Sequence, residues 1–168
     1  MQTKVYWTKE KHPRRIAIVP RQRGGEWLED EAAAWREANL DVIVSLLEAD
    51  ENAAFELARE AEFCEANNIS FFSFPIADRR VPVSKNALLE LLNKLKMLLV
   101  KGKNIGIHCR QSIGRSALLA AALMVLFGIS PSAAFQQLSE VRGLEVPETD
   151  EQRSWIENFA EESAVQTT

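Results

Sequence analysis

The sequence has few of the residues from which disulfide frameworks and metal centres are built. Its 168 residues include two cysteines, Cys64 and Cys109, and two histidines. Two cysteines cannot cross-link a small secreted scaffold through several bridges, and this low content fits a reducing compartment. The potential ligands also show no cluster with metal-ligand spacing. We therefore expect no metal and no cofactor.

An excess of one charge and a long apolar run are also missing. The formal net charge of −4 argues against a nucleic-acid binder that works through bulk electrostatics. The longest apolar run, Ala117 to Phe127, is too short to span a bilayer. The first residues contain no apolar core of a signal peptide. We expect a cytoplasmic protein without a membrane span and without a nucleic-acid partner.

No internal repeat, linker or low-complexity segment divides the chain. Its length is enough for one domain with a sizeable core. We therefore predict a single domain over residues 1–168, and we expect a monomer.

Apolar runs of strand length alternate with helical patterns along most of the chain. Val5–Trp7 and Ile16–Val19 predict a leading strand pair, separated by a basic stretch in which His12 is expected at the surface. Near-continuous apolar runs, typical of parallel sheets covered on both faces, follow later. The later strands are predicted at 41–47, 70–74 and 104–108, and helices at 26–39, 51–67, 84–102, 117–127, 131–141 and 149–160. The predicted fold class is α/β, with a central, mainly parallel, twisted sheet flanked by helices on both faces.

The segment from His108 to Ser116 lies between the last predicted strand and the most apolar helix. A strand that turns into a helix through such a loop points backbone N–H groups inward, and the helix start adds partial positive charge. This arrangement binds a tetrahedral dianion and favours the thiolate form of a cysteine, here Cys109. Arg115 adds a planar fork that can hold two phosphate oxygens. The segment thus combines a nucleophile, an anion cradle and a cationic clamp.

His108-Cys109, five residues and Arg115-Ser116 resemble the signature of the cysteine-dependent protein tyrosine phosphatase superfamily. The whole chain resembles a small bacterial dual-specificity-like phosphatase. The alternative, a structural cysteine beside a chance arginine, does not account for the strand before the motif and the helix after it. The resemblance implies that Cys109 is the nucleophile, that Ser116 hydrogen-bonds the sulfur and that His108 orients the loop.

The same resemblance assigns the phosphate cradle to Arg115 and to the backbone N–H groups of Arg110, Gln111, Ser112, Ile113 and Gly114. Many members of the superfamily have glycine at the position of Ser112. Serine fits there if the backbone avoids strongly positive φ, so we expect an ordinary backbone conformation.

Expulsion of an alkoxide or phenoxide needs a proton, so a nearby acid is expected. Asp78 follows a predicted strand and precedes Cys109 by 31 residues, which is about the separation at which the superfamily places its general acid. A solvated loop aspartate is the alternative, and Arg79 and Arg80 beside it are candidates to face the substrate. Glu48 and Asp50 are weaker candidates for the acid; for Asp50 a helix-capping role is favoured.

Two further assignments stay open at this point. The segment 146–152 resembles one in related phosphatases that positions the hydrolytic water, with Glu148 in place of the first glutamine and Gln152 matching the second. An ordinary helix start with acidic residues near its N-terminus explains the same pattern. Cys64 is either a buried small side chain or, as in some relatives, a disulfide partner that protects Cys109.

The resemblance implies a phosphatase for phosphate monoesters, namely phosphotyrosine and also phosphoserine or phosphothreonine in proteins. The expected intermediate is a cysteinyl-phosphate, and the expected partner is a phosphoprotein substrate. One alternative is a non-protein substrate, such as a phosphoinositide or an RNA 5′ phosphate. Another is a module that binds phosphoproteins without turnover, and the intact set of Cys109, Arg115 and Asp78 argues against it.

Overall fold

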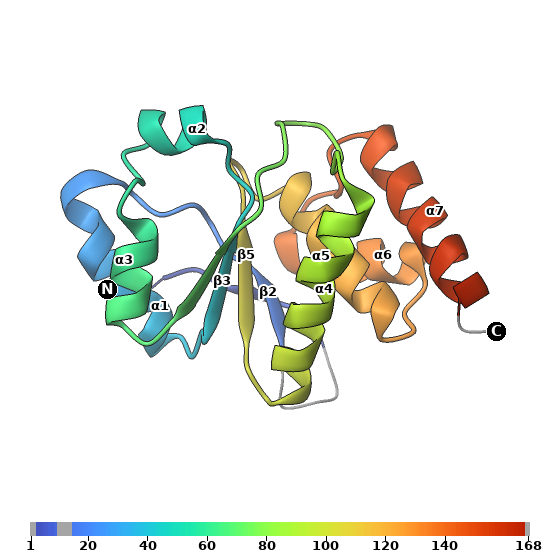
Figure 1. Cartoon of the computed structure of the whole chain (residues 1–168), viewed down its shortest axis with the longest axis horizontal. Coiled ribbons are helices and arrows are strands. Elements are labelled where there is room, and N and C mark those ends of the chain that lie inside the picture. Colours follow the sequence, from blue (N-terminus) through green and yellow to red (C-terminus); the bar gives the residue numbers. More distant parts are fainter. Residues whose placement is uncertain (1–2, 10–14, 167–168) are drawn as a thin grey trace.

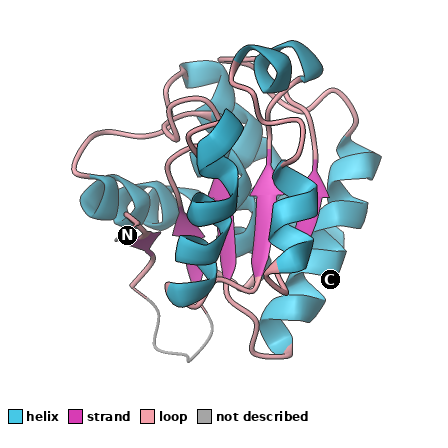
Figure 2. Ribbon diagram, turned by 90° about the vertical axis from the view of Figure 1, so that its left-hand side faces the viewer, coloured by secondary structure: helices cyan, strands magenta, loops and turns pink. Residues whose placement is uncertain are grey.

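The computed structural model describes residues 3–9 and 15–166, and five strands in this part of the chain form one sheet (Figures 1 and 2). The strands are β1 (Tyr6–Trp7), β2 (Ile16–Ile18), β3 (Val42–Ser45), β4 (Ser70–Ser73) and β5 (Ile105–His108). Their order is β1-β2-β5-β3-β4, and β1 alone of these runs antiparallel to its neighbour. The predicted strand pair and mainly parallel sheet are confirmed. His12 lies outside the described residues.

Helices cover both faces of this sheet, as predicted (Figure 1). Alternate strand residues point to opposite faces, so Ile16 and Ile18 join one apolar cluster while Ala17 and Val19 join the other. The larger cluster lies under α4 (Lys85–Val100), α5 (Arg115–Leu126), α6 (Pro131–Arg142) and α7 (Asp150–Gln166). The smaller cluster includes residues of α1 (Leu28–Glu37) and α3 (Glu60–Ala66). No helix among the described residues is long and apolar enough to cross a membrane.

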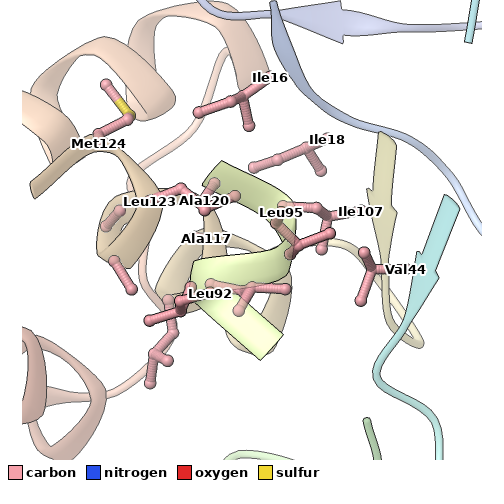
Figure 3. Packing of buried hydrophobic residues seen from close by; sticks show 14 of the residues in the cluster. Ile16, Ile18, Val44, Leu92, Leu95, Ile107, Ala117, Ala120, Leu123 and Met124 are labelled. Atoms are coloured by element: carbon pink, nitrogen blue, oxygen red, sulfur yellow. The ribbon is translucent and has the colours of Figure 1, made fainter. Parts of the chain in front are cut away.

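The helix α5 is the centre of the larger cluster. All its residues from Arg115 to Met124 are buried, as expected for a helix that is apolar all round. Ala117 and Ala120 lie in this cluster beside Leu92 and Leu95 of α4 and the strand residues Ile18 and Ile107, as Figure 3 shows. Small side chains let this helix approach the sheet closely. A helix held on all sides fixes the position of the loop that precedes it.

Three predicted helix boundaries were wrong. The region 51–67 forms two helices, α2 (Ala49–Ala54) and α3, because the chain turns at Glu56, whose φ is 55°. The first helix is preceded by a 3₁₀ turn, Gly25–Trp27, and begins at Leu28. The last helix continues to Gln166, six residues beyond the predicted end, because helix-forming polar residues carry on after its buried face ends.

The carboxyl ends of the parallel strands meet at one edge of the sheet, shown at the top of Figure 1. The loop after β5, the helix α2 after β3 and the segment between β4 and α4 all lie there. Open α/β sheets place their ligands at this edge.

Candidate active site

Cys109 directly follows β5 and lines a pocket of about 250 Å³ at this edge. The cysteine is 2% exposed. Most of the pocket wall is the loop itself, and Asp78 and Glu148 contribute from two other segments. Of the residues predicted to form the cradle, all but Ser112 line this pocket. The fold therefore brings the nucleophile candidate, the arginine candidate and the acid candidate together.

Ser112 has a left-handed backbone, with φ of 57°, so the expectation of an ordinary conformation was wrong. A left-handed conformation costs a non-glycine residue about 1 kcal/mol or more. Its hydroxyl donates a hydrogen bond of 2.6 Å to the carbonyl oxygen of Val19, at the end of β2. This buried contact offsets the strain and ties the loop to the sheet.

The outer side of the loop is held by Arg142, the last residue of α6. Its Nε donates to the carbonyl oxygen of Ser112 at 2.9 Å, and its Nη2 donates to that of Gln111 at 3.3 Å. The guanidinium also lies 4.4 Å from the ring centre of Tyr6 in β1. Because these carbonyl groups are held outward, the peptide N–H groups of the loop are free to face the pocket.

The Arg115 side chain is 1% exposed and is held by three segments. Nη1 donates to Glu51 and to the carbonyl oxygen of Ile76, each at 2.8 Å, and Nη2 donates to Glu51 at 2.8 Å. Nε is buried and has no hydrogen-bond partner among the described residues. Burial lowers the pKa of Arg115, but the bonds to Glu51 and the charges of Cys109, Glu51 and Asp78 outweigh that effect and raise it. The arginine is therefore a fixed cation with one edge still available.

Glu51 is a site residue that sequence reasoning missed. It binds Arg115 through both carboxylate oxygens and accepts a hydrogen bond from the backbone N–H of Glu48. Burial raises the pKa of Glu51, but these hydrogen bonds lower it more, so the carboxylate stays charged at neutral pH. Glu48, not Asp50 as predicted, is the residue that caps α2. Because glutamate is not among the usual N-cap residues, no capping signature in the sequence marked Glu51.

Asp78 lies in the segment between β4 and α4, with its side chain 43% exposed. Its Oδ1 is 3.1 Å from Nη2 of Arg115, and its Oδ2 is 4.0 Å from Nη1 of Arg110. The two arginines that follow it do not line the pocket themselves but pair with carboxylates just before α7 and within it. Arg79 pairs with Glu148 at 2.6 Å and Arg80 with Glu151 at 3.3 Å.

Gln152 connects the Asp78 segment to the start of α7. Its Nε2 donates to the carbonyl oxygen of Arg80 at 3.1 Å, and its Oε1 accepts from the N–H of Thr149 at 3.2 Å. The side chain also packs on Gly114, where an added Cβ would come within 2.8 Å of it. A residue larger than glycine at this point would push α7 away from the loop.

His108 faces the side of the sheet opposite Cys109. Its Nε2 is 2.7 Å from Oε1 of Glu60, and both side chains are buried. The ring also lies 5.8 Å from that of Trp35 in α1. These contacts hold the end of β5 on the face of the sheet opposite the pocket. Glu60, like Glu51, is a carboxylate that the sequence analysis did not identify.

The other two predicted roles have less support from the contacts. The Ser116 hydroxyl is buried and has no hydrogen-bond partner among the described residues, the Cys109 sulfur included. Cys64 and Cys109 are both free thiols and belong to different apolar clusters on opposite faces of the sheet. Among the described residues, no group of three or more potential ligands is placed to hold a metal ion.

Comparison with known proteins gives a match between residues 19–129 and the family described as polymorphic toxin system, DSP-PTPase phosphatase. Cyclin-dependent kinase inhibitor 3 from human is 32% identical over 92 residues, which cover 54% of this chain and 43% of that protein. The same protein from rat gives the same values. This chain thus spans less than half the length of these curated relatives.

Solved structures show the same fold. Kinase associated phosphatase, with its catalytic-site cysteine replaced by serine, has a TM-score of 0.86 over 98% of this chain and 97% of that chain, at 18% identity. Tk-PTP in the active form has a TM-score of 0.70 over 93% of this chain and 97% of that chain, at 25% identity.

Proposed function

We propose that this chain, which belongs to the DSP-PTPase phosphatase family within the cysteine-based protein tyrosine phosphatase superfamily, hydrolyses phosphate monoesters in proteins. Phosphotyrosine is the main substrate group, with phosphoserine and phosphothreonine also accepted. The observation that carries this proposal is the joint placement of Cys109, Arg115 and Asp78 on one pocket. The cytoplasmic location, monomeric state, single-domain organisation and bacterial origin stay predictions.

The proposed reaction has two steps. The Cys109 thiolate attacks phosphorus in line, so that the S–P bond forms while the ester O–P bond breaks, and Asp78 gives its proton to the leaving oxygen. A water molecule then attacks the cysteinyl-phosphate and gives a proton to Asp78. The S–P bond breaks, and inorganic phosphate and the thiolate are released.

The loop N–H groups from Arg110 to Gly114 and the Arg115 side chain stabilise the charge on the equatorial oxygens. The free Nε of Arg115 supports this role, because the other guanidinium nitrogens are already bound to protein. Asp78 lies 3.1 Å from Nη2, on the side where a phosphate oxygen would bind. The incoming dianion therefore replaces Asp78 at Nη2 and leaves its carboxyl group free to serve the leaving oxygen.

The remaining residues act through these groups. Gln152 and the Arg79–Glu148 pair hold the Asp78 segment against α7, and Glu148 lines the pocket where it can contact the hydrolytic water. His108 orients the loop from behind with Glu60. In the second step Ser116 donates a hydrogen bond to the sulfur as the S–P bond breaks and the thiolate forms.

The test is turnover of para-nitrophenyl phosphate and a phosphotyrosine peptide, with Cys109→Ser and the matched control Cys64→Ser. We expect Cys109→Ser to abolish turnover and keep anion binding, while Cys64→Ser keeps both. Rapid denaturation of the wild type during turnover of a ³²P-labelled peptide should leave label on Cys109. Residual activity of Cys109→Ser above roughly one tenth of the wild-type kcat would contradict a cysteinyl-phosphate mechanism.

The same assay separates the substrate classes. Phosphoinositides and a 5′-phosphorylated RNA are assayed beside phosphotyrosine and phosphothreonine peptides. A higher kcat/KM on either non-protein substrate would reassign the substrate. Tight binding of phosphopeptides by the wild type without any turnover would make the chain a binding module.

A further inference from the structure

An aromatic side chain, Phe55, lies next to the catalytic pocket between two arginines. It follows Glu51 by one helical turn, with its N–H bonded to the Glu51 carbonyl oxygen at 2.9 Å. The two side chains therefore share a face of α2, and Glu51 binds Arg115 in the pocket. The guanidinium of Arg21 lies 3.7 Å from the Phe55 ring centre, and that of Arg110 lies 5.7 Å from it.

This grouping is built by contacts between backbones. The segment after β2 packs directly on the end of α2, where an added Cβ on Gly24 would come within 1.8 Å of the Phe55 carbonyl oxygen. The N–H of Gly25 donates to the carbonyl oxygen of Glu56 at 3.0 Å. Two segments far apart in the sequence, 24–25 and 55–56, are thus held together by their backbones, close to Arg21 in the chain.

The two arginines on Phe55 differ from most others in the described chain. Arg36, Arg59 and Arg79, for example, donate hydrogen bonds to carboxylates. Arg21 donates no hydrogen bond to any described residue, and its Nε is buried without a partner. Arg110 approaches a carboxylate only at 4.0 Å, that of Asp78, and its side chain is 52% exposed. Both guanidinium groups thus lie near the ring, and neither is hydrogen-bonded to a carboxylate among the described residues.

Positive charge continues away from the pocket beyond Arg21. A surface hollow there is lined by Lys4, Arg21 and Arg23, with Glu31 as the acidic side chain in its wall. Glu31 pairs with Arg23 at 2.7 Å, so it does not neutralise Arg21. In a chain with net charge −4, this concentration of cations beside the catalytic pocket is a local feature.

We infer that Arg21 and Arg110, beside the ring of Phe55, form a subsite for a second anionic group of the substrate, and this inference rests on the proposed function. While Cys109 holds the phosphate to be cleaved, the subsite binds a phosphate or carboxylate on a neighbouring residue of the same phosphoprotein. The contact of Arg21 with the ring, at 3.7 Å from its centre, restricts that guanidinium before the anion binds, so less side-chain freedom is lost on binding. The preferred substrate is therefore a peptide with an acidic or second phosphorylated residue next to the phosphotyrosine.

The experiment compares kcat/KM on three substrates at low and at high salt. They are para-nitrophenyl phosphate, a phosphotyrosine peptide with neutral neighbours, and the same peptide with a second phosphorylated residue beside the phosphotyrosine. Charge-assisted hydrogen bonds of this kind predict that the wild type prefers the doubly phosphorylated peptide roughly tenfold. The preference should shrink at high ionic strength.

Arg21→Gln should remove most of this preference and leave kcat/KM on para-nitrophenyl phosphate within about twofold of the wild type. Phe55→Leu should weaken the preference as well, because it removes the ring beside which both guanidinium groups lie. Arg15→Gln is the matched control, since Arg15 also lies on an aromatic ring, that of Trp7, but at the opposite end of β2. It should keep the full preference.

Equal loss of activity on all three substrates in Arg21→Gln, or an unchanged preference, would overturn the subsite. An inositol bisphosphate is assayed as a fourth substrate. If Arg21→Gln lowers kcat/KM on it alone and leaves the peptides unaffected, the assignment to phosphoproteins is overturned. The dissociation constants of both peptides for Cys109→Ser, with and without Arg21→Gln, test the subsite without turnover. Failure of the wild type to hydrolyse any phosphate ester would thus contradict the proposed function alone.

Discussion

The two cysteines of this chain are both buried, but they meet charges of opposite sign. Cys64 lies in α3, in the smaller apolar cluster, where burial and then the charges of Glu60 and Glu65 raise the pKa of its thiol to about 12. Cys109 lies in the larger cluster and shares its pocket with the guanidinium of Arg115. A thiol that is desolvated next to carboxylates stays protonated, whereas positive charge favours the thiolate.

Burial by itself favours the neutral thiol, so a nucleophilic cysteine needs positive charge or N–H donors nearby. What distinguishes Cys109 is its place at the carboxyl end of a central strand, where loop N–H groups and Arg115 face it. Cys64 instead lies within the helix α3, where it is buried beside Glu60 and Glu65. The four predictions below test this contrast, beginning with the largest expected effect.

The pocket of Cys109 should also hold the proton donor, and Asp78→Asn tests this. General acid catalysis contributes roughly 10²–10⁴-fold, so kcat on a phosphotyrosine peptide should fall by that order. An acidic phenol leaves nearly unaided, so kcat on its aryl phosphate should fall much less. The alkaline limb of the pH profile should flatten, because it reports loss of the acid's proton. An equal loss on both esters would reassign the acid to Glu48 or Asp50.

Replacing Arg115 should be harmful even when the positive charge is kept. Arg115→Lys retains one positive charge but loses the planar fork, so kcat/KM should fall by roughly 10²–10³, close to the fall for Arg115→Ala. The rate of Cys109 alkylation by iodoacetate at neutral pH should fall in both variants. Near-normal kcat/KM in Arg115→Lys would mean that a positive charge is sufficient and that the planar guanidinium fork is not required.

Glu51→Gln should loosen Arg115 and lower kcat/KM by roughly tenfold. It should also change the pH dependence of stability. The pKa of Glu51 is below its ordinary value of 4.5 in the folded protein, so its contribution is present above pH 4.5 and is lost as the pH falls through the lowered value. Melting temperatures of wild type and variant should therefore differ at pH 6 and converge in acid. A constant difference at every pH would contradict the role of the Glu51 charge.

Cys64→Ala should have the smallest effect on catalysis. Because this thiol is buried and remote from the pocket, kcat should stay within about twofold, while unfolding is easier by about 1 kcal/mol. In the folded wild type, iodoacetamide at neutral pH should modify Cys109 and leave Cys64 intact, as read by peptide mass spectrometry. A disulfide between the two cysteines after mild oxidation would contradict the separation of the two thiols by the sheet.

Much of the architecture could be predicted because its signals are local. Apolar runs of strand length, the helical pattern capped by Ser84 and the all-apolar helix after Arg115 each lie within a short segment, and the structure has all three. The motif from His108 to Ser116 is equally local. The turn between α2 and α3 was harder to predict. It needs a positive φ at Glu56, and only glycine or asparagine at that position would have signalled such a turn.

The contacts that hold Arg115 and the loop in place could not be predicted, because they join residues far apart in the sequence. Glu51 is 64 residues from Arg115 in the sequence and carries no motif that relates the two. The left-handed conformation of Ser112 is accompanied by a hydrogen bond to Val19, the residue after β2 and 93 residues away. Only the packing of β2, β3 and β5 side by side brings these groups within hydrogen-bond distance.

The sequence by itself thus determined the fold class, the strand–loop–helix that carries Cys109 and Arg115, and the candidate acid Asp78, because each rests on the order of neighbouring residues. The tertiary structure decided which carboxylate fixes Arg115, which residues support the loop and which arginines lie beside the ring of Phe55. Charged side chains pair when they lie close together in space, and for these residues that proximity is produced by the strand order of the folded sheet.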